Sequence, residues 1–303
     1  MLYSYTGGRN YYGQLTNDTT SGNLTNGDTH VNADIIRILN LRPWPFLFRT
    51  ATAQSTANSQ AVEVPANIRK VTSVKVTSGT TEWTPREAPN REFWDRLNYT
   101  VATAYTSDYP EWWYTQDGEV LLFPTPSTAR TVSMTGRIGF SRLNIADYTT
   151  GQVTTATLGG TAIVGTASTV WTDPMKGRAL RITASDTANK GDDEWYMIAS
   201  VTDATNLTLK KPYRGTSIVV GTATYTIGQV SPIPDGYQEA PIYHATSIYY
   251  ASKGNKPKAA EFKAMRDDLV NQLVSDYGSG TDNVILDEAD LIDQTNPNLF
   301  VRT

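Results

Sequence analysis

The chain has no cysteine, few histidines and no long apolar run. Without cysteine, disulfide bonds and thiolate metal sites are excluded. The two histidines, His30 and His244, lie far apart in the sequence, so a histidine-rich zinc site is not expected. No run of about 18 apolar residues, the length of a membrane span, is present, and the first residues lack the apolar region of a secretory signal. We therefore expect no metal, no cofactor and no membrane partner.

An excess of positive charge is also lacking. The chain has 26 Lys and Arg against 30 Asp and Glu, a formal net charge of −4. Proteins that bind nucleic acid without regard to sequence concentrate Lys and Arg, so this class is disfavoured. Aromatic residues are plentiful, with 7 Trp, 17 Tyr and 7 Phe in 303 residues, which is enough to build a core. The length allows one large domain or two ordinary ones.

The first third begins with residues that favour loops. Residues 1–29 are rich in Thr, Asn and Gly, and we expect a loop there, with a short helix as the alternative. Residues 31–40 place apolar side chains at helical spacing and predict a short helix that ends before Pro43. The aromatic cluster at residues 44–48 is expected to anchor the core, and a contact between subunits is the alternative.

Strand patterns follow. Residues 61–76 alternate Val with polar residues and predict strands broken at Pro65. Residues 91–97 indicate a helical turn. The stretch DGEVLLFPTPSTARTVSMTGRIGFSRL, residues 117–143, predicts a hairpin with a proline-marked turn, after an earlier turn at Asp117-Gly118. Together, residues 1–150 are interpreted as the first part of a core domain.

The composition changes after Tyr148. From residue 149 to 228 the chain consists of short Thr, Gly, Val and Ala runs, which indicate five or six strands at a spacing of about ten residues. Residues 151–230 are therefore predicted to form a small β-barrel or β-sandwich inserted into the host domain.

Two helices are predicted next. Residues 237–251 favour a helix. The next helix, at residues 258–277, has the clearest pattern in the chain, and Gly278 is its predicted C-cap. The two helices should pack as a hairpin, and residues 231–280 should complete the core. The expected fold class is α+β: a helical hairpin or bundle with an antiparallel sheet and an inserted small β-module. One apolar stripe on the second helix is a candidate interface, formed by Phe262, Met265, Leu269 and Leu273.

The last segment, residues 281–303, combines acidic and apolar residues. It has five acids against one basic residue, Arg302. A purely solvating tail has little need for its apolar side chains, so it is expected to become ordered on a partner, by strand addition or groove docking. Folding back onto its own domain is an equally weighted alternative. The candidate partner-binding residues are Val284, Ile285, Leu286, Leu291, Ile292, Leu299, Phe300 and Val301.

Catalytic patterns are weak. The acids at 192–194 and 267–268 are better interpreted as solvated charges than as a catalytic pair. Asp108 and Glu111 flank a Trp pair that could form a sugar platform, although packing in a sheet is the simpler interpretation. His244 is expected to be a hydrogen-bonded core or interface residue. No nucleophile elbow, Walker A loop or dinucleotide fingerprint is present. We expect no catalysis.

Several short motifs follow one another in an order that resembles a known family. WPFLF follows the short helix, EVLLFPTP precedes a strand ending in IGFSRL, and IPDGYQEAPIYHA opens the helix pair. EWYMIASVTDATNLTLKKPYRG is the most specific stretch, and TTATLGGTA begins the β-module. In this order the chain resembles the head-to-tail adaptor proteins of tailed bacteriophages, including the tail tubular protein A family. The likeness covers most of the chain except residues 1–29 and the acidic tail.

The resemblance implies a structural virion protein. Members of this family form a ring of twelve copies beneath the portal protein. Double-stranded DNA passes through the channel of the ring to the tail or nozzle proteins. The implied location is the virion neck at the head–tail junction, after assembly in the host cytoplasm. The C-terminal segment is the implied portal contact. Two other classes stay open: a carbohydrate- or receptor-binding tail component, favoured by the Thr-rich module and residues 112–114, and a wall-degrading hydrolase.

Overall fold

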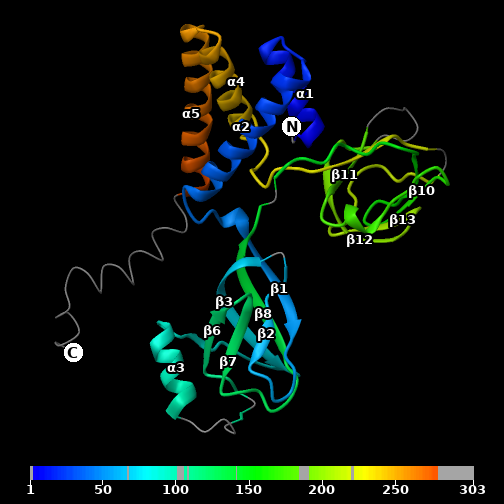
Figure 1. The fold of residues 1–303 in the computed structure, drawn as a ribbon. Coiled ribbons are helices and arrows are strands. Elements are labelled where there is room, and N and C mark those ends of the chain that lie inside the picture. The colour runs from blue at the N-terminus through cyan, green and yellow to red at the C-terminus, as the bar shows by residue number, and fades with distance from the viewer. Residues whose placement is uncertain are drawn as a thin grey trace. The chain divides into compact units, whose positions relative to one another are not determined.

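The chain forms two compact units, whose elements are drawn in Figure 1. The structure is a computed structural model that describes residues 3–66, 68–100, 106–107, 109–140, 142–183, 191–219 and 222–278. One unit is Pro43–Ser141; the other joins the residues up to Arg42 with those from Arg142 onward. Within the described ranges, no helix combines the length and hydropathy needed to cross a bilayer.

The Pro43–Ser141 unit contains two four-stranded sheets. The first has the order β1-β8-β3-β4, with strands β1 (Phe48–Gln54), β8 (Thr131–Ile138), β3 (Ile68–Ser78) and β4 (Thr81–Trp83). The second has the order β2-β7-β6-β5, with strands β2 (Ala61–Glu63), β7 (Glu119–Phe123), β6 (Trp112–Gln116) and β5 (Arg86–Glu87). Strands β5 and β6 pair in parallel, as do Thr106 and Thr125 in an isolated bridge. A short 3-10 helix, η1 (Pro45–Leu47), precedes β1.

Alternation along the strands sends side chains to two different cores. Trp113 of β6 lies in an apolar cluster with Val120 and Leu122 of β7 and with Val74 and Met134 of the other sheet, so the two sheets share one core. On the opposite face of β6 and β7, helix α3 (Arg91–Thr100) packs against the sheet. Its Trp94 forms a second apolar cluster with Phe123 of β7. The period of two along a strand produces this division.

The predicted hairpin over residues 117–143 is wrong. Its two strands, β7 and β8, belong to different sheets, and the chain between them passes from one sheet to the other. The turn predicted at Asp117-Gly118 is confirmed, because it joins β6 and β7, which pair directly. Both turn residues have positive φ, 51° and 83°, the geometry of a two-residue hairpin turn that favours Asp-Gly.

The second unit contains a helical part. Its helices are α1 (Tyr5–Thr16), α2 (Ser21–Asn40), α4 (Ala240–Ser252) and α5 (Lys256–Gly278). Helix α4 packs against α1, α2 and α5, and Figure 1 shows α4 and α5 side by side as an antiparallel pair. The predicted helical hairpin is thus confirmed. Over residues 1–29 the loop is wrong and the alternative of a helix is confirmed, because α1 and the first half of α2 lie there.

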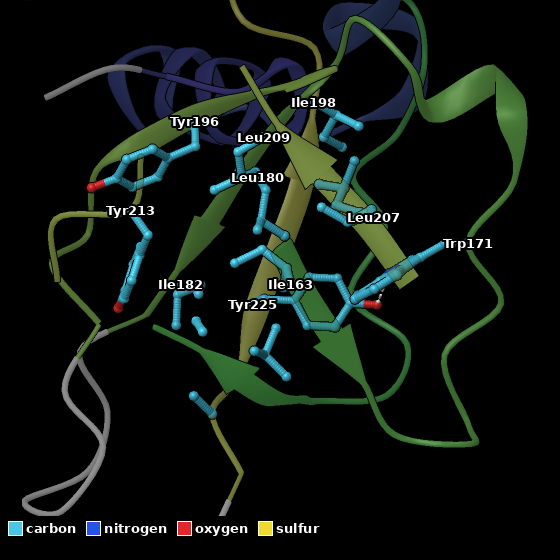
Figure 2. Packing of buried hydrophobic residues seen from close by; sticks show 14 of the residues in the cluster. Ile163, Trp171, Leu180, Ile182, Tyr196, Ile198, Leu207, Leu209, Tyr213 and Tyr225 are labelled. Atoms are coloured by element: carbon cyan, nitrogen blue, oxygen red, sulfur yellow. Dashed lines mark hydrogen bonds between the residues drawn. The ribbon is translucent and has the colours of Figure 1, made fainter. Parts of the chain in front are cut away.

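The second unit also contains a six-stranded sheet that curls into a half-barrel. Its order is β14-β11-β12-β13-β10-β9, and its strands are β9 (Val153–Ala156), β10 (Ala162–Gly165), β11 (Ala179–Ile182), β12 (Trp195–Asp203), β13 (Asn206–Leu209) and β14 (Tyr225–Gly228). A second 3-10 helix, η2 (Asp173–Met175), lies between β10 and β11. Figure 2 shows the apolar side chains inside the sheet, where the Trp171 indole donates to the Tyr225 hydroxyl at 2.8 Å.

The helical part and the half-barrel are joined by backbone contacts. The amide of Tyr5, at the start of α1, donates to the carbonyl of Gln229 at 2.9 Å. The Gln229 side-chain oxygen accepts from the amides of Asn144 and Ile145, each at 2.8 Å. The chain segments that enter and leave the half-barrel are therefore fastened to one another beside α1.

The expected fold class is wrong. In the described residues, three antiparallel or mixed sheets with 14 strands dominate, accompanied by five α-helices; this is not a helical hairpin bundle with a small inserted barrel. The physical reason is that residues 43–141 bury their aromatic and Val side chains between two sheets of their own and need no helical bundle to cover them. The domain limits expected at residues 150, 230 and 280 stay a prediction.

Candidate interaction site on the helices

Helix α5 is attached to the chain along one side. The Phe262 ring stacks on Tyr250 of α4, with the ring centroids 5.7 Å apart and the planes 4° from parallel, and lies 5.9 Å from the Tyr243 ring. The Ser247 hydroxyl of α4 donates to the carbonyl of Ala259 at 2.8 Å. These contacts define the inner side of α5.

A buried ion pair ties α5 to α2. The Arg266 guanidinium donates two hydrogen bonds to the Asp34 carboxylate, from Nη2 to Oδ1 at 2.9 Å and from Nε to Oδ2 at 3.2 Å. The Asp34 side chain is 0% exposed and that of Arg266 is 20% exposed. A third bond, from Arg266 Nη1 to Asp267 Oδ1 at 2.9 Å, is nearer the surface. The fork geometry fixes the rotation of α5 about its axis.

His244 of α4 lies beside this pair. Arg37 Nη1 is 3.1 Å from His244 Nε2; because arginine only donates, Nε2 is the acceptor and the proton of the neutral ring is on Nδ1. Burial lowers the pKa of His244, the charges of Arg266, Arg37 and His30 lower it further, and Asp34 acts in the opposite direction. The predicted hydrogen bond of His244 is confirmed. The residue is half-buried, and its place in an interface stays a prediction.

The predicted apolar stripe lies on one side of α5 and is buried to different degrees. Leu273 is buried, Phe262 and Leu269 are half-buried, and Met265 is 39% exposed at the edge of this side. The role of the stripe in an interface stays a prediction. The remaining candidates lie outside the described residues: Val284, Ile285, Leu286, Leu291, Ile292, Leu299, Phe300 and Val301.

The sequence analysis did not identify a group of lysines next to the start of α5. Lys253, Lys256 and Lys258 lie where α4 ends and α5 begins, and all three are exposed. We name these three residues the lysine end. The stretch SKGNKPK is visible in the sequence. Lys253 is the C-cap of α4, where the macrodipole favours positive charge, and Lys256 and Lys258 lie in the first turn of α5, where it does not. By contrast, nothing in the sequence pairs Asp34 with Arg266.

The acidic clusters have structural partners. The Asp192 carboxylate accepts from the Tyr196 hydroxyl, and burial followed by the Asp192 interactions raises the pKa of Tyr196 to about 12. Asp267 binds Arg266, and Asp268 accepts from Gln272 Nε2 at 2.9 Å. Within the described part of the chain, no three His, Cys, Asp or Glu residues are grouped so that they could hold a metal ion.

The aromatic rings at residues 112–114 are packed rather than presented to solvent. Trp113 is buried between the two sheets. On the other face, Trp112 meets Phe93 edge to face with centroids 4.8 Å apart, and Tyr114 stacks on Trp94 at 5.8 Å. Helix α3 thus covers the faces that a sugar platform would need.

A small cavity with a volume of about 30 Å³ lies among α1, α2 and α4. In its lining, the Asp28 carboxylate accepts from the Tyr5 hydroxyl at 2.8 Å and pairs with Arg9 Nε at 3.3 Å. A more open hollow of about 320 Å³ lies beside it, between α2 and residues 142–144.

Comparisons with known proteins do not identify a family: no protein-family model matches the chain, and no curated protein matches it significantly. The resemblance to head-to-tail adaptors therefore stays a prediction.

Proposed function

We propose that the chain is a structural protein of a phage virion that forms a ring beneath the portal and joins the head to the tail. In this role it binds other copies of itself, the portal protein and tail or nozzle proteins, and double-stranded DNA passes through the ring during ejection. Its place is the neck of the virion, after assembly in the host cytoplasm. It performs no catalysis.

The outer side of α5 carries this proposal. The helix has 23 residues and is about 34 Å long at 1.5 Å per residue. Its described intrachain contacts come from α4, from the Asp34 ion pair and from Tyr237, whose ring packs on Tyr277. Met265 is 39% exposed at the edge of this packed side, and Lys263, Ala264 and Asp268 are exposed on the opposite side. A rigid helix that is fixed on one side and free on the other suits a repeated contact between neighbours in a ring.

The alternative, a carbohydrate- or receptor-binding component, loses its main support. It depended on accessible rings at residues 112–114, and these pack on α3 and in the core. A hydrolase is likewise unsupported, because Asp192 serves Tyr196 and Asp267 serves Arg266.

Negative-stain imaging and light scattering, with the chain alone and with its portal, test the proposal. We expect rings with a central hole when the portal is present. A matched pair of variants locates the contact: Met265→Asp should prevent ring formation, whereas Met197→Asp, at an exposed position on the half-barrel, should not. A chain that stays monomeric with its portal and does not bind it would overturn the proposal.

A further inference from the structure

Strand β1 forms one edge of the first sheet of the Pro43–Ser141 unit. It is the outermost strand in the order β1-β8-β3-β4, and Figure 1 shows it at the side of that sheet. Its seven residues pair with β8 in an unbroken antiparallel register, from Phe48 opposite Arg137 to Gln54 opposite Thr131. The other edge strands, β4, β2 and β5, have only three, three and two residues. Among the described strands of this unit, β1 is therefore the longest open edge.

The backbone groups of β1 point alternately to β8 and to the open side. Directly after β1, the Ser55 amide donates to the Arg130 carbonyl at 2.8 Å, in the same register as the strand. Hydrogen-bonded pairs in an antiparallel ladder recur at every second residue, so the odd-numbered residues of β1 also direct their N–H and C=O groups to β8. The even-numbered residues direct these groups away from the sheet: Thr50, Thr52 and Gln54.

These outward groups are unpaired in the described part of the chain. No hydrogen bond from a described residue reaches the backbone of Thr50, Thr52 or Gln54, and all three residues are exposed. An open edge is a template for another strand, and proteins usually protect it with prolines, bulges or several charges. Strand β1 has no proline and no register shift, and Arg49 is its only charged residue.

The sequence of the open edge is complementary to itself. A two-fold axis at Thr52 places this residue opposite its own copy, Ala51 opposite Ala53, and Thr50 opposite Gln54. A contact about a two-fold axis requires such self-complementarity, because the same surface serves both copies. We propose that β1 pairs in antiparallel fashion with β1 of a second copy of the chain, with Thr52 at the axis.

Hydrogen bonding selects this register. The outward residues of the two strands then face one another as hydrogen-bonded pairs, and these pairs supply about six backbone hydrogen bonds. A shift of the axis to Ala51 would require the backbone of Phe48, whose carbonyl already accepts from Arg49 Nη1 at 2.8 Å. A shift to Ala53 would require Thr56, which lies beyond the end of the strand.

Charge and side chains agree with the pairing. In this register Arg49 faces Ser55, so the arginines of the two copies are about 20 Å apart along the strands, which is beyond the Debye length at physiological salt. On the other face of β1, the hydroxyls of Thr50 and Thr135 of β8 are 2.8 Å apart and hydrogen-bonded, and Gln54 Nε2 donates to the Thr131 hydroxyl of β8 at 2.9 Å. A second β1 would continue this polar cross-strand ladder.

The pairing is a property of the isolated chain and does not depend on the proposed role in a virion. A two-fold contact closes at two copies, whereas the contact proposed for α5 repeats around a ring. A single strand pair is a small interface of the kind that gives weak complexes. We therefore expect a dimer with a dissociation constant on the order of 10–100 µM.

A charge exchange at the axis tests the pairing, with sedimentation velocity of the full chain at about 5–500 µM as the measurement. The natural chain should change from one copy to two as its concentration rises. Thr52→Lys and Thr52→Glu each place like charges opposite one another, so each variant alone should dimerise at least about fivefold more weakly. An equal mixture places Lys opposite Glu and should regain the natural affinity within about twofold.

The matched control is an exposed threonine on the opposite edge of the same sheet. Thr81→Lys and Thr81→Glu, in β4, should dimerise as the natural chain does. Thr52→Pro removes an outward amide that the sheet itself does not use. It should therefore retain the circular dichroism spectrum and weaken dimerisation at least about fivefold.

Amide hydrogen exchange followed by nuclear magnetic resonance reports the register. Between dilute and concentrated protein, exchange at Thr50, Thr52 and Gln54 should slow at least about threefold, while Ala51 and Ala53, already bonded to β8, should not change. A natural chain that is monomeric at all concentrations would assign the open edge to a strand of another protein. That result overturns the proposal, as does a folded Lys and Glu mixture that dimerises no better than either variant alone.

Discussion

Arg266 of α5 donates two hydrogen bonds to Asp34 of α2, a residue 232 positions earlier in the sequence. The carboxylate is wholly buried, and its partner is 20% exposed. Removing one member of such a pair leaves the other charge without compensation, which is costly even where the intact pair adds little stability. The pair also decides which side of α5 faces outward.

Asp34→Ala should therefore lower the free energy of unfolding by about 2–4 kcal/mol, slightly less than for a fully buried pair because water reaches part of Arg266. Urea titration followed by circular dichroism measures the loss. The control is Asp268→Asn, which alters an exposed carboxylate on the same helix and should change stability by less than about 0.5 kcal/mol. Equal losses in the two variants would mean that the buried pair does not hold the helices.

His244 should make the helical unit sensitive to acid. Burial lowers its pKa in the folded chain, so the unfolded chain binds the proton more readily. Its contribution to stability is complete above the unfolded pKa of about 6.5 and decreases as the pH falls below that value. The groups that face it are Asp34, Arg266, Arg37 and His30.

Unfolding midpoints measured between pH 7.5 and pH 5.5 check this sign. The midpoint of the natural chain should fall with pH, and His244→Gln should reduce that fall. His30→Gln is the comparison variant: it removes the smallest of the effects that lower the pKa of His244, so it should retain most of the fall. If both variants respond to pH as the natural chain does, another group causes the acid sensitivity.

Two glycines of α2 should respond oppositely to the same substitution. A Cβ atom at Gly27 would lie 2.3 Å from the Tyr12 ring of α1, so Gly27→Ala should destabilise the chain by about 1–3 kcal/mol. A Cβ atom at Gly22 meets no atom within 4 Å, so Gly22→Ala should stabilise α2 by up to about 1 kcal/mol. Thermal unfolding measures both. Changes of the same sign at both positions would contradict the close packing of α1 on α2.

Gly27 also shows why the sequence misled at this end of the chain. Gly, Asn and Thr are poor helix formers, so propensity alone predicts a loop over residues 1–29, with a short helix as the alternative. Tertiary packing overrides that preference, because Gly27 lets the Tyr12 ring lie against α2 and the Tyr12 hydroxyl donates to Asn23 at 2.9 Å. Local composition contains no information about a contact with another helix.

Patterns with a local cause were predicted well. The Asp117-Gly118 turn, the strands on either side of Pro65, the six strands of the half-barrel and the helix that became α5 all follow from turn chemistry or periodicity. The sequence patterns do not predict which strands pair with one another. Strands β7 and β8 are consecutive in the chain but belong to different sheets. The Arg266–Asp34 pair was missed for the same reason, since only the folded chain brings the two together.

The C-terminal segment should be needed for attachment to the portal. Deleting residues 282–303 removes the apolar residues that are proposed to meet the partner, while α5 keeps its contacts with α4 and α2. We expect portal binding to weaken at least about tenfold, a loss of about 1.4 kcal/mol, in a pull-down or interferometry measurement. The circular dichroism spectrum should show the same helices. Unchanged binding after the deletion would assign portal contact to another surface.

Tyr225 should be essential to the half-barrel through its hydroxyl as well as its ring. The hydroxyl accepts from the Trp171 indole at 2.8 Å and donates to the carbonyl of Thr150 at 2.5 Å, inside the apolar core of Figure 2. Tyr225→Phe keeps the ring but leaves a buried donor and acceptor unpaired, which costs about 1–3 kcal/mol. The control is Tyr109→Phe, at a tyrosine that is 57% exposed, and it should cost less than about 0.5 kcal/mol. Near-ultraviolet circular dichroism should also report a changed environment of Trp171 in the first variant alone; equal stability of the two variants would show that water replaces the lost hydroxyl.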